Sequence, residues 1–541
     1  MEKTTGHRHM PAPLPYDDLI RSFNWDIPAR FNIGTDIADK WARTNRIALI
    51  VRDENGSRRD VTFKELTRQS NRLANVLKAH GLGPGDRIGL LLPQCPQTAI
   101  SHIAAYKIGA IAVPLASLFG VDALLYRLAD SGAKIVVTDA AGAEKIAEIA
   151  DQLADLTLVI VVGGGGDSDF DRLLEGGADS FEAVASGPDD PAVMVYTSGT
   201  TGPPKGALHG HRVLLGHLPG VAFTHDGFPQ KGDVMWTPAD WAWAGGLFNI
   251  LLPSLHFGLP VVVHNFQKFD PEAAFALMAD CGVRNAFVPP TALKMMRTVA
   301  GPAKTHDLVL RTIASGGETL GGEVYDWGRA ELGLTINEFY GQTECNIVVG
   351  SSAALGVSRR GAIGKPVPGH QVAIIDPWGR EVDRGEPGQI AIRRPDPVMF
   401  LGYWRQPQAT ADKFIGDWMT TGDQGIMDND GYIGFVGRND DVITSAGYRI
   451  GPGEIEDCLI GHPAIALAAA VGKPDPLRTQ IVKAFVVLAK GYEPSSALAE
   501  EIREHVRTRL SAHEYPREID FIDELPLTTT GKIIRRLLRE T

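Results

Sequence analysis

The chain has 541 residues, of which 44% are hydrophobic and 22% are charged. These values are ordinary for a globular protein, and the length allows several domains. Lys and Arg number 53 against 65 Asp and Glu, which gives a formal net charge of -12 with no long basic run. This balance argues against nucleic acid as a partner.

The four cysteines, Cys95, Cys281, Cys345 and Cys458, lie far apart in the sequence and form no CxxC pair. This spacing indicates neither a zinc site nor a disulfide framework, and it fits a reducing cytoplasm. The first fifteen residues, MEKTTGHRHMPAPLP, lack the apolar core of a signal peptide. We therefore expect a cytoplasmic protein.

The segment from Gly245 to Val263 carries no charged residue over a length close to that of a membrane span. Pro253, Gly258 and Pro260 interrupt it, and helices rarely continue through such residues. The segment therefore predicts a buried helix, a turn and a core strand, and we expect no membrane span.

Helical and strand patterns alternate along the first part of the chain. Thr62 and Glu65 form a capping box ahead of an amphipathic helix that Gly81 ends. Further strands are expected at 87–92, 111–115 and 134–138, with helices over 96–108 and 121–130. Alternating strands and helices favour a parallel sheet covered on both faces.

The alternation resumes after residue 260, which predicts a second α/β unit. It contains apolar runs at 261–263, 285–290 and 310–314, and helical patterns over 271–281 and 292–299. Short runs with turn signals between 361 and 394 then indicate a small β-rich subdomain. Runs at 466–471 and 482–488 and a helix near 498–510 predict a separate C-terminal α/β domain.

The stretch YTSGTTGPPKG, from Tyr196 to Gly206, concentrates hydroxyls, glycines and a lysine directly after a buried strand. Free backbone N–H groups, hydroxyls and Lys205 together suit a polyphosphate. A Walker A loop is excluded because only two residues separate Gly199 from Gly202, and Gly206 follows the lysine. A plain surface turn is the alternative for this stretch alone.

Two other patterns resemble ligand sites but lack the neighbouring residues that such sites need. The glycine-rich patch at 163–171 has no helix with a closely spaced lysine after it, so it predicts a surface connection. His209, His211 and His217 have a spacing that could suit a metal, but they have no cysteine or carboxylate partner and lie where a helix is expected to start.

Six motifs resemble those of the adenylate-forming superfamily, and in particular its acyl-CoA synthetases, over nearly the whole chain. Besides YTSGTTGPPKG they are SGGETL at Ser315, EFYGQTE at Glu338, TTGD at Thr420, GRNDDVITSAGYRIGPGEIE at Gly437 and PLTTTGKIIRR at Pro526. The resemblance implies a large N-terminal domain (1–436) of two α/β units plus a small β-rich subdomain. It also implies a hinge (437–441) and a small mobile C-terminal α/β domain (442–541).

The resemblance implies that a carboxylic acid and ATP form an acyl-adenylate and pyrophosphate, and that coenzyme A then displaces AMP. Lys532 is expected to contact the carboxylate and the α-phosphate, with Thr343 on that phosphate and Glu344 on Mg²⁺, which prefers oxygen ligands. Tyr340 would face the adenine, Asp423 would accept from the ribose, and Arg438 would lie near the nucleotide. The remaining expected nucleotide contacts are Thr197, Ser198, Gly199, Thr200, Thr201, Gly202, Lys205, Gly317 and Glu318.

The second half of the reaction is expected to need a different arrangement. In this family the C-terminal domain rotates about an aspartate that Asp440 matches. Rotation would bring one segment against coenzyme A, namely Ala446, Gly447, Tyr448 and Arg449. Arg478 is a further candidate for contact with a coenzyme A phosphate. A solvated loop arginine is the alternative for Arg478.

Gly341, Trp243 and Gly245 are the expected residues of the acyl pocket. Acetyl-CoA synthetases carry Trp where this chain has Gly341, so we expect an acid longer than acetate, with medium-chain acyl-CoA synthetases as the subgroup most similar. The sequence also allows branched-chain and aryl acids as substrates. Lys532 is in addition a candidate for regulation by a lysine acetyltransferase and deacetylase.

Two other functions remain as alternatives. One is an adenylation enzyme with another acceptor, such as a separate carrier protein; only nine residues follow Lys532, so we expect no fused carrier. The other is a nucleotide-binding protein without catalysis, against which the joint presence of Lys532, Thr343, Glu344 and Asp423 argues.

Overall fold

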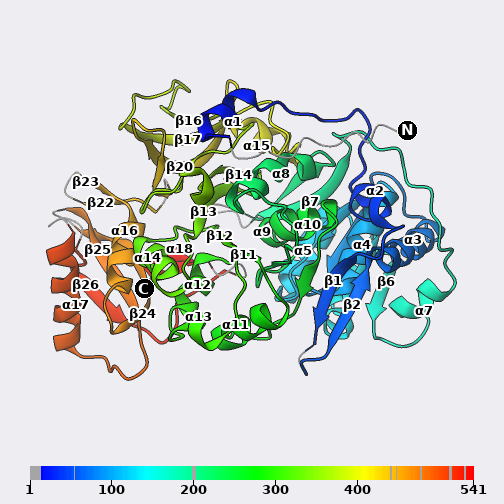
Figure 1. Cartoon of the computed structure of the whole chain (residues 1–541), viewed down its shortest axis with the longest axis horizontal. Helices are drawn as coiled ribbons and strands as arrows, with labels where there is room; N and C mark the ends of the chain where they lie inside the picture. The colour runs from blue at the N-terminus through cyan, green and yellow to red at the C-terminus, as the bar shows by residue number, and fades with distance from the viewer. Residues whose placement is uncertain are drawn as a thin grey trace.

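The computed structural model describes residues 14–53, 55–197, 203–438, 441–445, 448–475, 478–510, 515–528 and 532–540. In this part of the chain, two large sheets and two five-stranded sheets carry the fold. Figure 1 shows the two large units side by side, with a β-rich layer above them and the C-terminal part at one end. The expected α/β class is confirmed.

The first large sheet has seven strands in the order β18-β8-β7-β4-β3-β5-β6. Strands β7, β4, β3, β5 and β6 are parallel, and β8 and β18 continue the sheet in antiparallel pairing. Its bounds are β3 (Arg87–Leu91), β4 (Ile111–Pro114), β5 (Ile135–Asp139), β6 (Leu158–Val162), β7 (Pro191–Thr197), β8 (Lys205–Gly210) and β18 (Gly402–Tyr403). The associated helices are α3 (Phe63–Ala79), α4 (Pro96–Lys107), α5 (Val121–Ser131), α6 (Ala140–Ala147) and α7 (Phe170–Glu175).

Local signals set the ends of these helices. The Thr62 side chain accepts a hydrogen bond from the backbone N–H of Glu65 and caps α3, as the capping box predicts. In a full capping box the Glu65 side chain would accept from the backbone N–H of Thr62. Here the Glu65 carboxylate pairs instead with Arg59 at 2.7 Å. One half of the expected box therefore forms.

The second large sheet has nine strands in the order β15-β14-β13-β12-β11-β9-β10-β1-β2. Its bounds are β1 (Ile47–Arg52), β2 (Arg58–Thr62), β9 (Met235–Trp236), β10 (Val261–Val263), β11 (Asn285–Phe287), β12 (Thr312–Gly316), β13 (Asn337–Gln342), β14 (Cys345–Gly350) and β15 (Lys365–Pro366). The associated helices are α8 (Val213–Thr224), α11 (Pro271–Asp280), α12 (Pro290–Met296), α13 (Pro302–Thr305) and α14 (Gly322–Glu331).

This sheet corrects the simple picture of two units that follow one another in the chain. Strand β1 pairs in parallel with β10, with Leu49 opposite Val261. The hairpin partner β2 then forms the outer edge. The N-terminal strands therefore belong to the second sheet by their strand pairing. Leu49 nevertheless packs in a core cluster that also contains residues of the first sheet, whereas Ile50 packs in the core of the second.

One local expectation is corrected and another is confirmed. The strand β8, and not a helix, follows the glycine-rich loop, so His209 lies on a strand while His217 lies in α8. The apolar segment after Trp243 forms α9 (Ala244–Gly246), a π-helix (Leu247–Leu251) and α10 (Leu252–His256) before β10. In the described part of the chain, no helix is long and apolar enough to cross a membrane.

The β-rich subdomain and the C-terminal part each contain a five-stranded sheet. The first consists of β16 (Val372–Ile375), β17 (Pro387–Arg393), β19 (Phe414–Ile415), β20 (Trp418–Met427) and β21 (Ile433–Arg438), and α15 (Pro407–Ala411) lies between β18 and β19 in the chain. The second consists of β22 (Ile443–Ser445), β23 (Tyr448–Ile450), β24 (Ile465–Asp475), β25 (Thr479–Leu488) and β26 (Glu518–Phe521). With it are α16 (Pro452–Ile460), α17 (Ser496–Arg509) and α18 (Arg535–Arg539).

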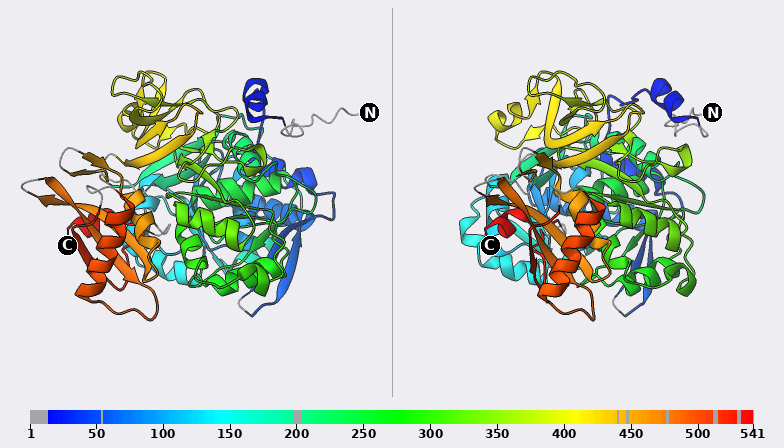
Figure 2. Two further views of the ribbon diagram at one scale, coloured as in Figure 1. Left: turned by 60° about the vertical axis from the view of Figure 1, so that its left-hand side comes forward. Right: turned by 90° about the vertical axis from the view of Figure 1, so that its left-hand side faces the viewer.

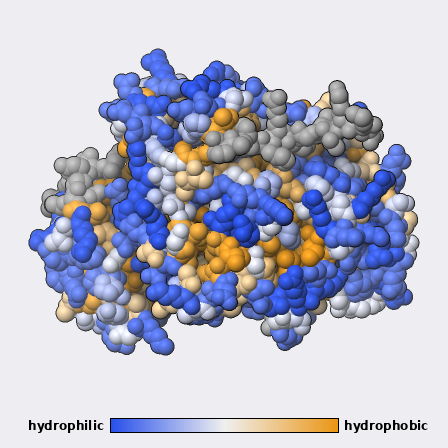
Figure 3. Space-filling view, viewed as in Figure 1, coloured by the Kyte–Doolittle hydropathy of each residue, from blue (hydrophilic) through white to orange (hydrophobic). Residues whose placement is uncertain are grey.

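The C-terminal part has an apolar core of its own, which includes Ile455 and Leu459 of α16 and Ile502 of α17. Figure 2 shows this part set against one side of the molecule. The exposed face is hydrophilic over most of its area, and apolar residues gather near the centre of the view in Figure 3. A region with its own apolar core can move as a unit, so the separate core of the C-terminal part is compatible with the expected rotation.

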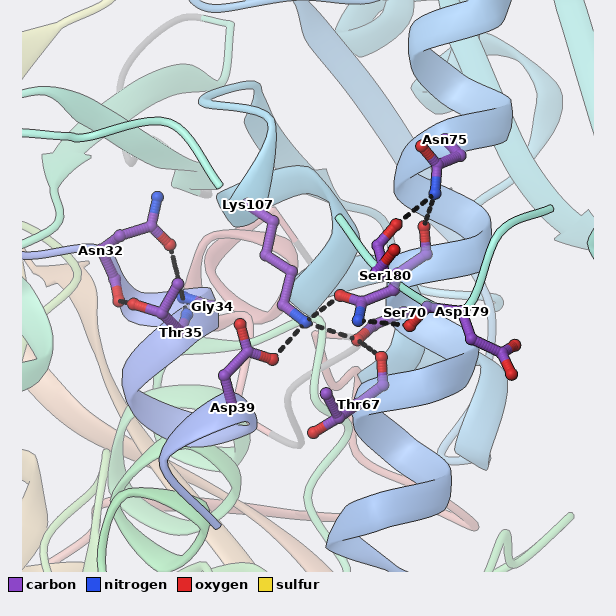
Figure 4. Close-up of polar contacts among 11 residues, drawn as sticks. Asn32, Gly34, Thr35, Asp39, Thr67, Ser70, Asn75, Lys107, Asp179 and Ser180 are labelled. Carbon is purple, nitrogen blue, oxygen red and sulfur yellow. Dashed lines mark hydrogen bonds and ion pairs between the residues drawn. The ribbon is translucent and has the colours of Figure 1, made fainter. Parts of the chain in front are cut away.

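A buried lysine ties the N-terminal segment to the first sheet. The Lys107 side chain, 0% exposed, donates to Asp39, Ser70 and Asn71 at 2.6, 3.2 and 2.6 Å (Figure 4). Burial lowers its pKa from the ordinary value, and the Asp39 carboxylate opposes that effect. A buried cation is tolerated only with such partners, so these contacts fix α2 (Ile33–Ile37) and the turn after it against α3 and α4.

Candidate active site

A cavity of about 790 Å³ opens between the second sheet, the β-rich subdomain and the C-terminal part. Its lining comes from the ends of β12 and β13, from β20 and β21, and from α16, α18 and the segment around Lys532. The carboxyl ends of parallel strands are where α/β sheets bind ligands. Three parts of the chain that are far apart in sequence therefore meet at one site.

Tyr340 and Asp423 form the polar floor of this cavity. The Tyr340 hydroxyl donates to Asp423 Oδ2 at 2.5 Å, and Gln342 Nε2 donates to the same oxygen at 2.7 Å. Gln342 Nε2 also donates to the carbonyl of Thr421 at 2.8 Å. These contacts hold the Asp423 carboxylate in one orientation.

The second oxygen of Asp423 lacks a hydrogen-bond donor among the described residues. Oδ1 is buried and accepts no hydrogen bond from the described residues, although Arg438 Nη1 lies 3.7 Å away. Burial raises the pKa of this carboxyl, while hydrogen bonds from Tyr340 and Gln342 and the charges of Arg438 and Lys532 oppose the rise. A buried acceptor of this kind fits a ligand that brings hydroxyl donors, as the ribose of a nucleotide does.

Lys532 points into the same cavity. It is among the lining residues, and a Cβ placed on Gly317 would lie 3.7 Å from its Cε atom. The backbone N–H of Lys532 donates to Thr528 Oγ1 at 3.0 Å. The lysine charge and the Asp423 carboxylate are thus close enough to influence one another.

Glu344 and Thr343 lie at the turn between β13 and β14, on the wall of the cavity. The Tyr403 hydroxyl donates to Glu344 Oε1, and Lys205 Nζ lies 5.2 Å from the centre of the Tyr403 ring. The arrangement leaves Glu344 Oε2 for a cation, since a carboxylate accepts at both oxygens. An oxygen ligand beside an open cavity suits Mg²⁺.

The backbone around Gly317 forms another edge of the cavity. Gly317 has φ +98°, a conformation that favours glycine, and Glu318 Oε2 accepts from Thr291 Oγ1 at 2.8 Å. Both residues line the cavity, as expected from the sequence.

The glycine-rich loop connects β7 and β8 as a hairpin in which Thr197 pairs with Lys205. Both of these residues line the cavity. The five residues between them on which the phosphate expectation also depends lie outside the described residues: Ser198, Gly199, Thr200, Thr201 and Gly202.

The expected coenzyme A segment lies in the C-terminal part. Tyr448 and Arg449 belong to β23, and Ser445 of β22 pairs with Thr479, which brings the backbone at Arg478 next to this hairpin. The Arg478 N–H donates to Asp475 Oδ1 at 2.8 Å. The hairpin tip, Ala446 and Gly447, and the expected hinge residue Asp440 lie outside the described residues.

The expected acyl pocket is only partly brought together. Gly341 lines the cavity, whereas Trp243 and Gly245 do not, and Trp243 packs edge-on against Phe119 at 5.7 Å. A Cβ on Gly341 would lie 2.5 Å from the backbone of Asn346 and Ile347. The space beside Gly341 is therefore filled by strand β14, which corrects the idea that this glycine alone leaves an open pocket.

Two phenylalanines occupy the space beside other glycines. A Cβ on Gly245 would lie 2.7 Å from the Phe287 ring, and one on Gly316 would lie 2.6 Å from the Phe339 ring. The two rings are in contact, with centroids 5.4 Å apart. Phe339 thus lines the cavity, and Phe287 packs behind it.

Sequence reasoning missed Gln342, Tyr403, Phe287 and Phe339. Gln342 was within reach, since it lies between Tyr340 and Thr343 in a motif already singled out. Tyr403 is 59 residues from its partner Glu344, and no local pattern marks it.

The three histidines do not form a metal centre. His209, His211 and His217 are buried, and burial lowers their pKa values to about 3, 4 and 4. No group of three or more metal-ligating side chains occurs among the described residues. These neutral imidazoles are part of the core.

Comparison with known proteins agrees with this geometry. The family model of the AMP-binding enzyme matches residues 38–404, and that of the AMP-binding enzyme C-terminal domain matches residues 454–532. The chain is 36% identical to the acetyl-coenzyme A synthetase of Bacillus subtilis, with 97% of this chain and 94% of the relative covered. It is 35% identical to the human mitochondrial acyl-coenzyme A synthetase ACSM4, with 98% and 94% covered.

Among solved structures, an anthranilate CoA ligase, AuaEII, in complex with anthranoyl-AMP matches with a TM-score of 0.87. Its identity is 29%, over 95% of this chain and 98% of that one. Fold, cavity and sequence similarity therefore agree over nearly the whole length. The chain belongs to the AMP-binding enzyme family, among its AMP-forming acyl-CoA synthetases.

Proposed function

We propose that this acid–CoA ligase acts on a carboxylic acid larger than acetate, with an apolar chain or an aromatic ring, and that Lys532 is its catalytic cation. The enzyme uses ATP, Mg²⁺ and coenzyme A and proceeds through an acyl-adenylate. The observation that carries the proposal is that Lys532 and Asp423, whose buried Oδ1 lacks a hydrogen bond from the described residues, line one cavity.

In the first half of the reaction, two negatively charged groups repel each other. The acid's carboxylate must approach the α-phosphate of ATP, so charge neutralisation and positioning dominate the barrier. We assign Lys532 to the carboxylate and the α-phosphate, and Thr343 to the same phosphate. Asp423 holds the ribose, and Arg438 lies near the nucleotide.

The remaining nucleotide contacts follow from the cavity wall. Glu344 is assigned to Mg²⁺, which when bound supplies positive charge at the phosphates. Tyr340 is assigned to the adenine, with Gly317 and Glu318 along its edge. The loop from Thr197 to Lys205 is assigned to the β- and γ-phosphates and then to pyrophosphate.

The second half requires Lys532 to leave the cavity so that a thiol can attack the adenylate. We propose that residues 437–441 act as the hinge around Asp440 between domains 1–436 and 442–541. The segment 446–449 would then face the cavity and contact coenzyme A with Arg478. Gly437 and Arg438 still belong to β21, so we expect the bending to begin after Arg438.

The substrate class follows from the aromatic end of the site. The Phe287 and Phe339 rings fill the space beside Gly245 and Gly316, so the apolar volume near Phe339 depends on how these two rings pack. Each methylene buried there would stabilise binding by about 0.8 kcal/mol. The anthranilate CoA ligase with a similar fold supports aryl acids as one branch of this class.

The experiment is thioester formation with ATP, Mg²⁺ and coenzyme A across acetate, straight-chain C4 to C12, branched and aromatic acids, beside Lys532→Ala. We expect turnover with C4 or longer or aromatic acids and none in the variant. Acetate as the best acid would overturn the substrate proposal. AMP and pyrophosphate without thioester would instead favour another acceptor, such as a carrier protein.

We also propose regulation by acetylation of Lys532, because the modification removes the charge on which adenylation depends. Lys532 is solvent-exposed, which supports access by an acetyltransferase and a deacetylase. Mass spectrometry of native protein that finds only unmodified Lys532 under all growth conditions would count against it. A cytoplasmic location is proposed with it, supported by the free thiols of all four cysteines.

A further inference from the structure

Helix α14 lacks a cap of its own. Its N-cap position is Gly321, with φ +81°, and no side chain of the helix accepts from its first N–H groups. Unsatisfied N–H groups at a helix start need an acceptor, and a carboxylate is favoured there by the helix dipole.

The missing cap comes from the C-terminal part. Asp457 of α16 accepts from the N–H of Gly322 at 2.9 Å through Oδ2 and from that of Glu323 at 3.3 Å through Oδ1. A Cβ on Gly321 would lie 2.4 Å from Asp457 Oδ1, so only glycine lets the carboxylate approach. Figure 1 shows α14 and α16 side by side at this junction.

Positive charge supports the contact. The Arg360 guanidinium lies over Gly322 and pairs with Asp326 at 2.9 Å. Asp457 is one of the carboxylates that raise the pKa of Arg360. The Asp457 carboxylate is therefore placed between two N–H donors and a cation.

Glu456, the residue before Asp457, links α16 to the segment that contains Lys532. Glu456, buried in α16, accepts from Arg535 Nη2 at 2.8 Å with both carboxylate oxygens. Arg535 begins α18, three residues after Lys532. Helix α16 is thus fixed to the N-terminal part by Asp457 and to the lysine segment by Glu456.

We infer that Asp457 is a positioning residue, which holds the C-terminal part in the orientation that places Lys532 in the cavity. The inference rests on the proposed rotation of residues 442–541. A rotation that removes Lys532 from the cavity also removes Asp457 from α14, so the contact stabilises only the orientation for adenylation. Loss of the Asp457 contact should slow formation of the acyl-adenylate and leave the rate of thioester formation unchanged.

The test compares Asp457→Asn and Asp457→Ala with Glu518→Gln, a matched carboxylate of the C-terminal part that pairs with Lys473 and touches no residue of the N-terminal part in the described contacts. We expect acid-dependent ATP–pyrophosphate exchange to fall roughly tenfold in Asp457→Ala, the size of a lost helix cap. Thioester formation from supplied acyl-adenylate and coenzyme A should be unchanged or faster. Equal losses in both half-reactions, or no loss in either, would overturn the inference.

A second readout needs no activity. In the unliganded wild-type protein, the amides of Gly322 and Glu323 should be protected from hydrogen exchange, and Asp457→Ala should remove this protection while α17 stays protected. Protection that is unchanged in the variant would overturn the inference. Wild-type enzyme that shows the protection but activates no acid would contradict the proposed function instead.

Discussion

Tyr340 and Asp423, 83 residues apart in the chain, are joined by a 2.5 Å hydrogen bond from the tyrosine hydroxyl to Oδ2 of the carboxylate. The bond links β13 of the second large sheet to β20 of the β-rich subdomain. Asp423 lines the cavity, and its buried Oδ1 has no hydrogen bond from the described residues. The nucleotide floor is therefore assembled between two sheets.

Replacing Tyr340 by Phe should weaken ATP binding. The change removes a donor to a buried carboxylate, a bond worth about 1.5–3 kcal/mol, and so loosens the orientation of Asp423. We expect the KM for ATP to rise about tenfold or more, with a smaller change in the KM for the acid. Tyr432→Phe, which loses a 3.2 Å bond to the Gly356 carbonyl away from the cavity, is the control. An unaltered KM for ATP would contradict the role of this bond.

Replacing Tyr403 by Phe should raise the Mg²⁺ concentration needed for half-maximal activity. Its hydroxyl holds Glu344, and loss of a partner behind a metal ligand costs about 10- to 100-fold in metal affinity. Activity at saturating Mg²⁺ should recover most of the wild-type rate. The measurement is a Mg²⁺ titration at fixed ATP, with Glu344→Gln as the severe reference. A variant that needs no more Mg²⁺ than wild type would show that Tyr403 does not orient this ligand.

Shortening Phe287 should shift the preference towards longer acids. Phe287→Leu and Phe287→Ala vacate the space beside Gly245, and each extra methylene that enters contributes about 0.8 kcal/mol. We expect the ratio of kcat/KM for decanoate to that for butyrate to rise at least tenfold in the alanine variant. Phe275→Leu is the matched control, because Phe275 is equally buried but packs against His306. A ratio that moves equally in the control would indicate general loosening.

Glu338 should make stability depend on pH. Burial raises the pKa of its carboxyl to about 7 from 4.5, and the charge of Asp457 adds to the rise. Between these two values the folded protein binds more protons than the unfolded chain, so the free energy of unfolding falls as pH increases. The full cost, roughly 3 kcal/mol for such a shift, is reached above pH 7 and is absent below pH 4.5.

The variant Glu338→Gln removes this ionisation and keeps an oxygen for the Leu320 N–H, which now donates to Glu338 Oε1 at 3.0 Å. We expect the variant to unfold at a higher temperature than wild type at pH 8 and at the same temperature near pH 4.5. Thermal unfolding across this range checks it, beside Glu331→Gln on the exposed face of α14. A constant difference between variant and wild type at all pH values would refute the linkage.

Local sequence signals predicted most of the elements because each signal acts within a few residues. Thr62 caps α3, Gly81 follows the end of that helix with φ +81°, and the strands at Arg87 and Ile111 begin where their apolar runs begin. The pairing of β1 with β10 was not predictable in this way. Strand order depends on contacts between distant segments, and periodicity within a strand does not specify its partner.

The residues of the site also fall into two groups, those marked by local motifs and those identified only by contacts between distant segments. Lys532, Thr343, Glu344, Tyr340 and Asp423 all lie in motifs recognisable as continuous stretches, and the structure brings them to one cavity. Tyr403, Phe287 and Asp457 act through partners more than forty residues away. Nothing in their immediate neighbours distinguishes them from ordinary core or surface residues, so only the folded chain identifies them.

The pairing of Leu49 with Val261 has a consequence for synthesis on the ribosome. Domains generally fold in the order in which they emerge, but here β1 and β2 leave the ribosome first and must wait for β10. In the meantime β3 to β7 can begin to assemble, while β1, with apolar residues such as Leu49 and Ile50, pairs with β2 and lacks β10. An amino-terminal fragment that ends before β10 would therefore carry a β1 that pairs only with β2 and has one edge open to other chains.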